Sequence, residues 1–190
     1  MLKSISGYAT AVLLGAGFLW LPPLAAQIHS PVKAVRPTSN AIAAAHTERT
    51  FEFTVRLPMQ SAAPLFGADK ERIWAPGWNP QFIWPAKAYD RQGVVFTIGQ
   101  GRKTAVWIAP AYDPASGFFQ YAYVIPDVMV TLITLKLTPQ DEWTHVAVRY
   151  ERTALNAAAR QTVMEMADQD SKAGPDWEKQ INDYVDTLPK

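Results

Sequence analysis

The sequence predicts an α+β domain in which one antiparallel sheet packs against a C-terminal helix. Two observations support this fold class. Short strand-like segments follow one another from about residue 47 to residue 152, with tight polar turns between them. The last part of the chain then carries apolar residues at helical spacing. A sheet with one apolar face must cover that face, and the C-terminal helix is the long amphipathic segment available to do so.

The first 26 residues are predicted to be a secretory signal peptide. Lys3 supplies a positive charge, residues 11–21 form a short apolar stretch, and Ala25-Ala26 offers small residues at a cleavage site. Two prolines end the apolar stretch well short of the ~20 residues that a membrane span requires. Cleavage before Gln27 is therefore favoured over a membrane anchor, and the protein is expected to be periplasmic or secreted. An uncleaved N-terminal segment would be its one route to membrane contact.

Residues 27–46 are predicted to be a poorly ordered linker because they are rich in Pro, Ser and Asn, and residues 47–190 then form the folded domain. The chain has no Cys, which excludes disulfides, thiol nucleophiles and a lipid anchor on cysteine. Its formal net charge is +1 and no basic run stands out. Nucleic acid and anionic membranes are therefore not expected partners. No cofactor is expected either.

The predicted sheet begins at residues 47–57, where Phe51, Phe53 and Val55 alternate with polar residues as in a half-buried strand. Residues 58–68 are then expected to form short helical turns. Short spacers separate the later strands, so consecutive hairpins and an antiparallel meander are expected. These strands are predicted over residues 82–84, 94–99, 103–110, 118–125, 128–137 and 142–152.

The C-terminal part is predicted to be helical. Asn156 is the expected N-cap of a helix over residues 157–168, and Gly174-Pro175 interrupts the pattern. The segment after this break is amphipathic, and the terminal helix is expected to bury its stripe against the sheet. The stripe consists of Trp177, Ile181, Tyr184, Val185 and Leu188.

Residues 71–85, with the sequence ERIWAPGWNPQFIWP, resemble a signature of the START-like (SRPBCC) superfamily of polyketide cyclase/dehydrase and lipid-transport type. Weaker similarity lies at residues 93–101 and 149–155, and the resemblance covers roughly residues 50–188. It implies the helix-grip fold, a curved antiparallel sheet wrapped around a C-terminal helix with a cavity between them. The family's last helix is usually continuous, and the break at Gly174-Pro175 departs from that pattern.

The resemblance also implies a function. Members of the superfamily bind lipids, sterols, polyketides or hormones, and a minority of them are cyclases or dehydratases. Strict alternation along the strands assigns several side chains to the interior of the sheet. They would form an apolar wall with a few hydroxyls, the usual makeup of a small-molecule pocket, or else a solid core. The predicted ligand-binding residues are Trp78, Tyr121, Tyr123, Met129, Thr131, Ile133 and Tyr150.

Two local features have competing interpretations. Trp74 and Trp78 flank a Pro-Gly turn, and either line the lip of a pocket or pin their loop to the core, with pinning favoured. Glu71 and Arg72 are expected to form a local ion pair rather than an acid/base group. His145 is expected on the solvent side of its strand and the other two histidines precede the domain, so no catalytic residue and no metal site are predicted.

The leading function is non-catalytic binding or transport of an apolar small molecule outside the cytoplasm. One alternative is a cyclase/dehydratase-type enzyme with Tyr121 or Tyr123 as proton donor, for which the sequence offers no partner base. The other is a protein-interaction module that uses the aromatic loop 74–84. A carboxylate beside a tyrosine in a cavity would favour the enzyme, and a filled core would favour the interaction module.

Overall fold

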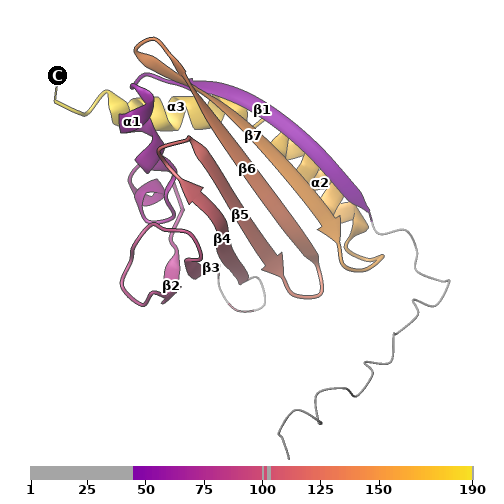
Figure 1. Cartoon of the computed structure of the whole chain (residues 1–190). Helices are drawn as coiled ribbons and strands as arrows, with labels where there is room; N and C mark the ends of the chain where they lie inside the picture. Colours follow the sequence, from indigo (N-terminus) through magenta and orange to yellow (C-terminus); the bar gives the residue numbers. More distant parts are fainter. Residues whose placement is uncertain (1–44, 100, 102–103, 190) are drawn as a thin grey trace, which may run out of the picture. The chain divides into compact units, whose positions relative to one another are not determined.

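The protein, examined as a computed structural model, is described over residues 45–99, 101 and 104–189. The predicted signal peptide and nearly all of the predicted linker lie outside these residues. Seven strands form one sheet in the order β1-β7-β6-β5-β4-β3-β2, and each strand is antiparallel to its neighbours (Figure 1). The strands are β1 (His46–Val55), β2 (Gln81–Trp84), β3 (Val95–Ile98), β4 (Ala105–Asp113), β5 (Phe118–Ile125), β6 (Met129–Gln140) and β7 (Trp143–Ala154).

The long strands β6 and β7 show why this sequence folds as a sheet. They pair from Met129↔Ala154 to Gln140↔Trp143, and every second residue of β6 is buried as far as Leu137. Successive side chains of a strand point to opposite faces, so this alternation places the apolar set on one face. Strands β2 to β7 form an uninterrupted meander, and the first strand, β1, pairs with the last strand, β7, so β1 and β2 are the two edges of the sheet.

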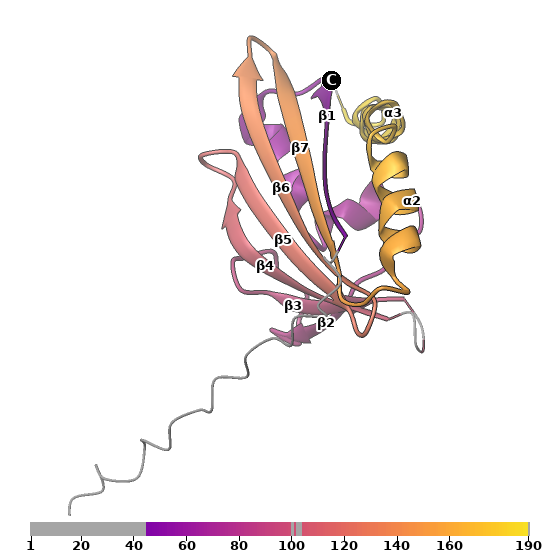
Figure 2. The same ribbon diagram turned by 90° about the vertical axis from the view of Figure 1, so that its right-hand side faces the viewer.

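In the described part of the chain, five helical segments accompany the sheet. They are the short α-helix α1 (Met59–Ala62), the 3₁₀ turns η2 (Ala63–Phe66) and η3 (Lys70–Ile73), and the helices α2 (Arg160–Asp170) and α3 (Gly174–Val185). In the edge view of Figure 2, α2 and α3 both lie on one side of the curved sheet and run in different directions. Over the described residues, no helix combines the length and apolar character needed to cross a membrane.

This arrangement is the helix-grip fold that the sequence predicts. Two details differ. The terminal helix does not cover the sheet alone, because α3 packs against β1, α2 packs against β1 and β7, and residues 59–78 cover more of the same face. Helix α2 starts at Arg160 rather than Ala157, and Asn156 lies in the turn before it, where its amide oxygen accepts a hydrogen bond from the Ala159 amide (2.9 Å).

The predicted end of β4 at Pro110 is also too early. The strand continues to Asp113, and its pairing with β5 shifts register between Ile108 and Ala111. A proline lacks the amide hydrogen of a ladder bond, and a register irregularity is one place where a strand accommodates it. The strand therefore passes the proline instead of ending there.

Candidate functional site

A cavity of about 290 Å³ lies between the concave face of the sheet, the segment that carries η3, and helix α3. Its wall contains four tryptophans, which come from three separate parts of the chain. The complete lining is Glu71, Trp74, Ala75, Pro76, Gly77, Trp78, Trp107, Tyr121, Ile133, Leu135, Tyr150, Trp177 and Gln180. The volume is near the lower end for small-molecule pockets.

Two of these tryptophans are anchored by their own indole nitrogens. Trp74 Nε1 donates to the Leu65 carbonyl and Trp78 Nε1 donates to the Ala68 carbonyl, both at 2.7 Å. A buried indole N–H that has a partner fixes the orientation of its ring. The loop is thus pinned to the core as expected, and the same rings also line the cavity.

The other two tryptophans come from β4 and α3. Trp107 stacks on Tyr123 with ring centroids 4.2 Å apart, and Trp177 makes an edge contact with Phe51 at 5.4 Å. The four indoles form two edge-to-face pairs, Trp74 with Trp177 (5.8 Å) and Trp78 with Trp107 (5.3 Å). Rings at a large angle to each other border the cavity from different directions. Among the described residues, Trp107 Nε1 is the buried side-chain nitrogen that lacks a hydrogen-bond partner.

Glu71 is the carboxyl of the cavity wall. Its side chain is only 6% exposed, and no ion pair or side-chain hydrogen bond to it is found within the described part of the chain. Burial, with the negative charge of Asp90 as a second cause, raises the pKa of Glu71 well above its ordinary value. The expected ion pair with Arg72 is wrong, because Arg72 points away and pairs with Asp69 (3.2 Å).

Asp90 positions the segment that carries Glu71. Its carboxylate accepts hydrogen bonds from the backbone amides of Asp69 (2.7 Å) and Lys70 (3.3 Å) at the start of η3. This contact requires Gly67, since a Cβ there would lie 2.2 Å from an Asp90 carboxylate oxygen. Burial is the main cause that raises the pKa of Asp90 itself.

The two tyrosines of the wall differ in their hydroxyl groups. The Tyr121 hydroxyl donates to the Phe66 carbonyl (2.6 Å), so it is committed to the protein. No hydrogen bond of the Tyr150 hydroxyl is found among the residues described, and burial raises the pKa of both tyrosines. Tyr150 therefore offers a hydroxyl that a ligand could engage.

Four of the seven residues predicted to contact a ligand lie in the cavity wall: Trp78, Tyr121, Ile133 and Tyr150. The other three, Tyr123, Met129 and Thr131, are buried on the expected face but are not part of this wall. Alternation identified the correct face for the six of these residues that lie on strands, yet that face is longer than the cavity, and Trp78 reaches the wall from the loop after η3. The other lining residues, which include Glu71, Trp74, Trp107 and Trp177, were not among the predicted ligand contacts.

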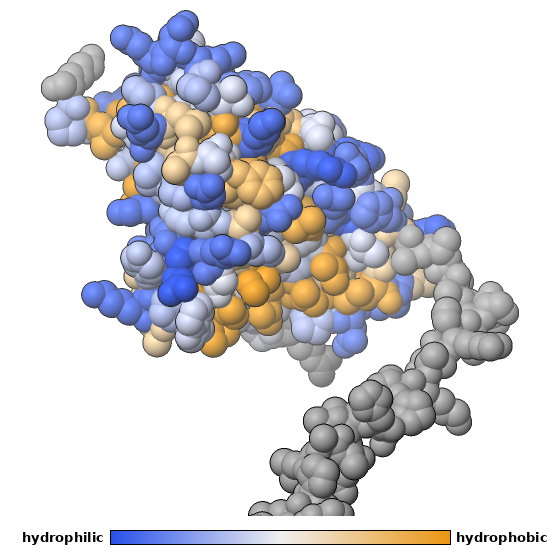
Figure 3. All heavy atoms as spheres, viewed as in Figure 1, coloured by the Kyte–Doolittle hydropathy of each residue, from blue (hydrophilic) through white to orange (hydrophobic). Residues whose placement is uncertain are grey.

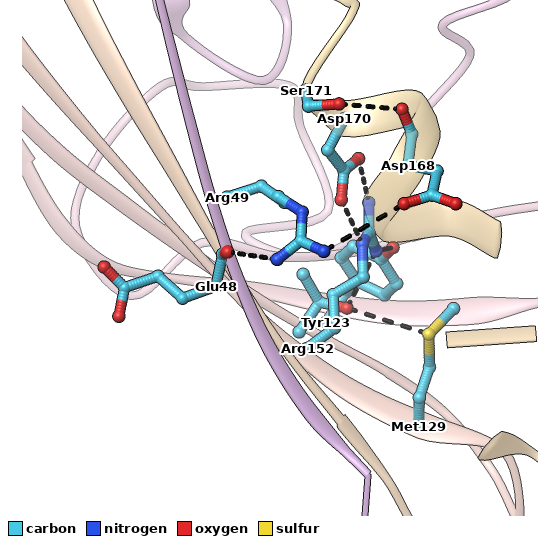
Figure 4. Close-up of polar contacts among 9 residues, drawn as sticks. Glu48, Arg49, Tyr123, Met129, Arg152, Asp168, Asp170 and Ser171 are labelled. Carbon is cyan, nitrogen blue, oxygen red and sulfur yellow. Dashed lines mark hydrogen bonds and ion pairs between the residues drawn. The ribbon is translucent and has the colours of Figure 1, made fainter. Parts of the chain in front are cut away.

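Tyr123 and Thr131 instead surround a buried ion pair between Arg152 of β7 and Asp170 of α2 (Figure 4). Arg152 Nε and Nη2 donate to the two Asp170 oxygens at 2.6 and 2.7 Å, and Nη1 donates to Thr131 Oγ1 at 3.0 Å and to the Tyr123 hydroxyl. Arg152 follows Tyr150 by two residues on the same face of β7, so alternation contained the signal that it is buried. Its partner could not be identified from the strand pattern.

The other chemical groups considered from the sequence lie away from the cavity. His145 is on the outer face, where its Nε2 is 3.7 Å from Glu52 Oε2. In the described part of the chain, no cluster of three His, Cys, Asp or Glu side chains could hold a metal ion.

The outer face of the sheet carries a separate apolar patch (Figure 3). Val106 of β4, Val124 of β5 and Val130 of β6 are paired in register and partly exposed, and Ile108 is next to them. In the aromatic loop 74–84, only Ile83 and Trp84 are large apolar residues that are half exposed. The loop is therefore a weaker contact surface than its sequence indicates, because its other tryptophans point inward.

No protein-family model and no curated protein matches the chain in sequence. Solved structures do match it. Ara h 8.0201 is 17% identical with a TM-score of 0.56, and the match covers 76% of this chain and all of that one. Norcoclaurine synthase from Thalictrum flavum (10%, TM-score 0.55) is covered over 90% of its length by 77% of this chain. CalU16 from Micromonospora echinospora is 10% identical with a TM-score of 0.52, and the match covers 78% of this chain and 87% of that one. Because the sequence identities are this low, the structural matches establish the fold alone. It is the START-like helix-grip fold.

Proposed function

We propose that this domain binds an apolar small molecule in the tryptophan-lined cavity, and that it does so outside the cytoplasm. The observation that carries the proposal is the cavity itself. Four indoles, Ile133 and Leu135 supply an apolar wall, and only a few polar groups face the interior. A mostly apolar concave site with a small number of polar groups is the general composition of small-molecule pockets.

The structural neighbours support the proposal at the level of architecture. One of them is, by its printed name, norcoclaurine synthase. The helix-grip fold leaves a space between sheet and helix, and here that space is not filled by the protein's own side chains. The proposed role for this chain is binding or transport, with the ligand enclosed between the indoles.

Titration with tert-butylbenzene tests the proposal, with tryptophan fluorescence as the readout because four indoles line the site. Saturable quenching or enhancement is expected for the wild-type protein. Gln180 lines the cavity from α3 and is only partly buried, so Gln180→Trp should fill the space without disturbing the core. Binding should fall at least about tenfold in this variant.

Gln169→Trp is the matched control, because Gln169 is an exposed glutamine on α2 that does not line the cavity. This variant should bind as the wild type does. Equal binding by both variants and the wild type would place the ligand elsewhere, on the outer apolar patch of Val106, Val124 and Val130. The absence of saturable binding in all three proteins would reject the carrier function.

A second candidate is an enzyme of the cyclase/dehydratase type. The observation that favours it is the Glu71 carboxyl in the same cavity wall as the Tyr150 hydroxyl, which supplies the acid/base partner that the sequence did not reveal. Burial and nearby charge raise the pKa of Glu71, as is common for general acids and bases. Tyr121 and Tyr123, the proton donors first considered, already have hydrogen-bond partners in the protein.

Exchange of the methyl hydrogens of acetophenone for deuterium from the solvent tests this candidate, since removal of a proton next to a carbonyl is the expected first step. Saturable exchange by the wild type should disappear in Glu71→Gln and decrease in Tyr150→Phe. If the wild type gives no exchange above the buffer rate while tert-butylbenzene binds, the enzyme candidate is rejected and binding alone remains.

Export belongs to the same proposal and depends on residues outside those described. The positive Lys3, the short apolar stretch and the small residues before Gln27 support it. N-terminal sequencing of protein secreted by a bacterial host should find a start near Gln27. Intact Met1 on membrane-bound material would support an anchor instead.

A further inference from the structure

The tryptophan cavity has a carboxyl in its wall and no basic side chain. Among the described residues that line it, Glu71 is the acidic one, and Lys, Arg and His are absent. The charge of Asp90 also acts on Glu71 from outside the lining. The electrostatic environment of the cavity is therefore negative whenever Glu71 is ionised.

No basic side chain of the described residues forms an ion pair with this carboxyl. The Arg152 guanidinium lies 4.8 Å from the centroid of the Tyr150 ring, but Asp170 holds it through two hydrogen bonds. Lys70 and Arg72 flank Glu71 in sequence and are exposed, and Arg72 pairs with Asp69. A buried charge requires a counter-charge, and the described part of the protein does not provide one to Glu71.

The aromatic wall suits a positive charge as well as an apolar body. The face of an indole ring is electron-rich and attracts cations more strongly than the other aromatic side chains do. The edge-to-face pairs Trp74–Trp177 and Trp78–Trp107 surround the space from several directions. A carboxyl within an aromatic enclosure is the arrangement that recognises amines and quaternary ammonium groups.

We propose that the cavity takes an organic cation, a compact amine or quaternary ammonium compound with an apolar body. This inference rests on the proposed binding function and names the chemical class of its ligand. The volume of about 290 Å³ corresponds to roughly ten water molecules, so the ligand has about ten non-hydrogen atoms. The raised pKa of Glu71 is consistent with this class, because a bound cation would offset the burial and the Asp90 charge that cause it.

Two ligands of nearly the same shape test the inference: phenyltrimethylammonium and its neutral isostere tert-butylbenzene, each with about ten non-hydrogen atoms. Their affinities for the full chain are compared at pH 8 by tryptophan fluorescence. The cation should bind at least about tenfold tighter, which corresponds to about 1.4 kcal/mol. Glu71→Gln should bring the two affinities close to parity. Glu142→Gln, in the exposed turn between β6 and β7, should keep the wild-type preference.

The outcomes separate the two proposals. Equal binding of both ligands by the wild type, or tighter binding of tert-butylbenzene, overturns the cation inference and leaves the binding function standing. Failure of both ligands to bind overturns both. The wild-type comparison stands without any variant, so a folding defect in Glu71→Gln does not block the test.

The same assay with choline and phosphocholine distinguishes two sources of the cation. Tighter binding of choline supports a free amine, because the phosphate of phosphocholine would meet the negative charges of Glu71 and Asp90. Tighter binding of phosphocholine supports a lipid headgroup as the source of the same cation. If neither binds although phenyltrimethylammonium does, the apolar body of the ligand is essential to the recognition of the cation.

Discussion

At the scale of single residues, Glu71 is a carboxyl that the fold removes from water without supplying a counter-charge among the described residues. The packing that buries it also builds the cavity, since its backbone carbonyl accepts the amide hydrogens of Trp74 (3.2 Å) and Ala75 (2.8 Å). The turn that brings Trp74 and Ala75 to the cavity wall therefore also places Glu71 beside them. Such a group is costly to ionise and marks a site where the protein's own interactions are incomplete.

The raised pKa of Glu71 predicts how stability depends on pH. The folded state holds the proton more tightly than the unfolded state, so the stabilisation is complete below the unfolded value near 4.5 and is lost as the pH rises through the folded pKa. Glu71→Gln keeps the shape without the charge. Urea unfolding is measured from pH 4 to pH 8. As the pH rises, the free energy of unfolding of the variant should increase relative to that of the wild type, by at most about 1.4 kcal/mol per pH unit.

The comparison with Glu71→Gln isolates Glu71, because the other titrating groups are common to both proteins. The charged or titratable groups around it are Asp90, the flanking Lys70 and Arg72, the tyrosines 112, 121 and 150, and the pair Arg152–Asp170. Free energies of unfolding that stay parallel across the pH range would show that Glu71 titrates normally in the folded protein.

At the scale of elements, helix α2 is tied to the sheet by one buried ion pair. Asp170 is the last residue of α2, and its carboxylate meets Arg152 of β7 through two hydrogen bonds. Asp170→Ala would leave the arginine buried without a partner, which typically costs about 3–5 kcal/mol. Urea unfolding measures this loss, and Arg152→Met/Asp170→Ala should recover part of it because no unpaired charge remains.

Asp168 offers the matched control on the same helix. It lies 4.0 Å from Arg49, and its side chain is largely exposed, so Asp168→Ala should cost no more than about 1 kcal/mol. Equal losses for Asp168→Ala and Asp170→Ala would mean that the buried pair does not attach α2 to the sheet.

Helix α3 closes the cavity through Trp177. This indole makes edge contacts with Phe51 (5.4 Å), Phe53 (6.0 Å) and Trp74 (5.8 Å), while Ile181 is fully buried one turn later. Trp177 is partly buried against the core, so Trp177→Ala should cost about 2–3 kcal/mol in unfolding experiments, less than the range for fully buried tryptophans. Lys179→Ala, on the exposed side of the same helix, should change stability by about 0.5 kcal/mol or less. A loss below about 1 kcal/mol for Trp177→Ala would contradict a covering role for α3.

At the scale of the whole molecule, the sheet order brings distant segments around one space. The wall combines the segment around η3, strands β4 to β7 and helix α3, so the cavity exists only in the assembled fold. A ligand that binds the folded state alone stabilises all of these parts together. Phenyltrimethylammonium at about 100 times its dissociation constant should therefore stabilise the wild type by roughly 2.7 kcal/mol.

Thermal unfolding with and without this ligand is the measurement, followed separately by tryptophan fluorescence and far-ultraviolet circular dichroism. The midpoint should rise by the same amount for both signals in the wild type and remain unchanged in Gln180→Trp. A shift seen by fluorescence alone would indicate a local effect on the indoles rather than binding that is coupled to the whole fold.

The sequence by itself determined the strands, their faces and the fold class. The periodicity of two along β5, β6 and β7 assigned Tyr121, Ile133 and Tyr150 to the interior, because alternation is a local property of each strand. The similarity of residues 71–85 to the START-like signature then predicted a cavity against this face. The signal peptide and the linker remain predictions, since those residues lie outside the part of the chain that the structure describes.

Only the tertiary structure decided which groups meet. Glu71 is next to Arg72 in sequence but not paired with it, because the short turn η3 directs one side chain inward and the other outward. Arg152 meets Asp170 because two elements that are separate in sequence pack together, and Trp107 and Trp177 reach one cavity for the same reason. Local patterns specify the face of an element, whereas the partner across the core depends on packing between elements that no local pattern records.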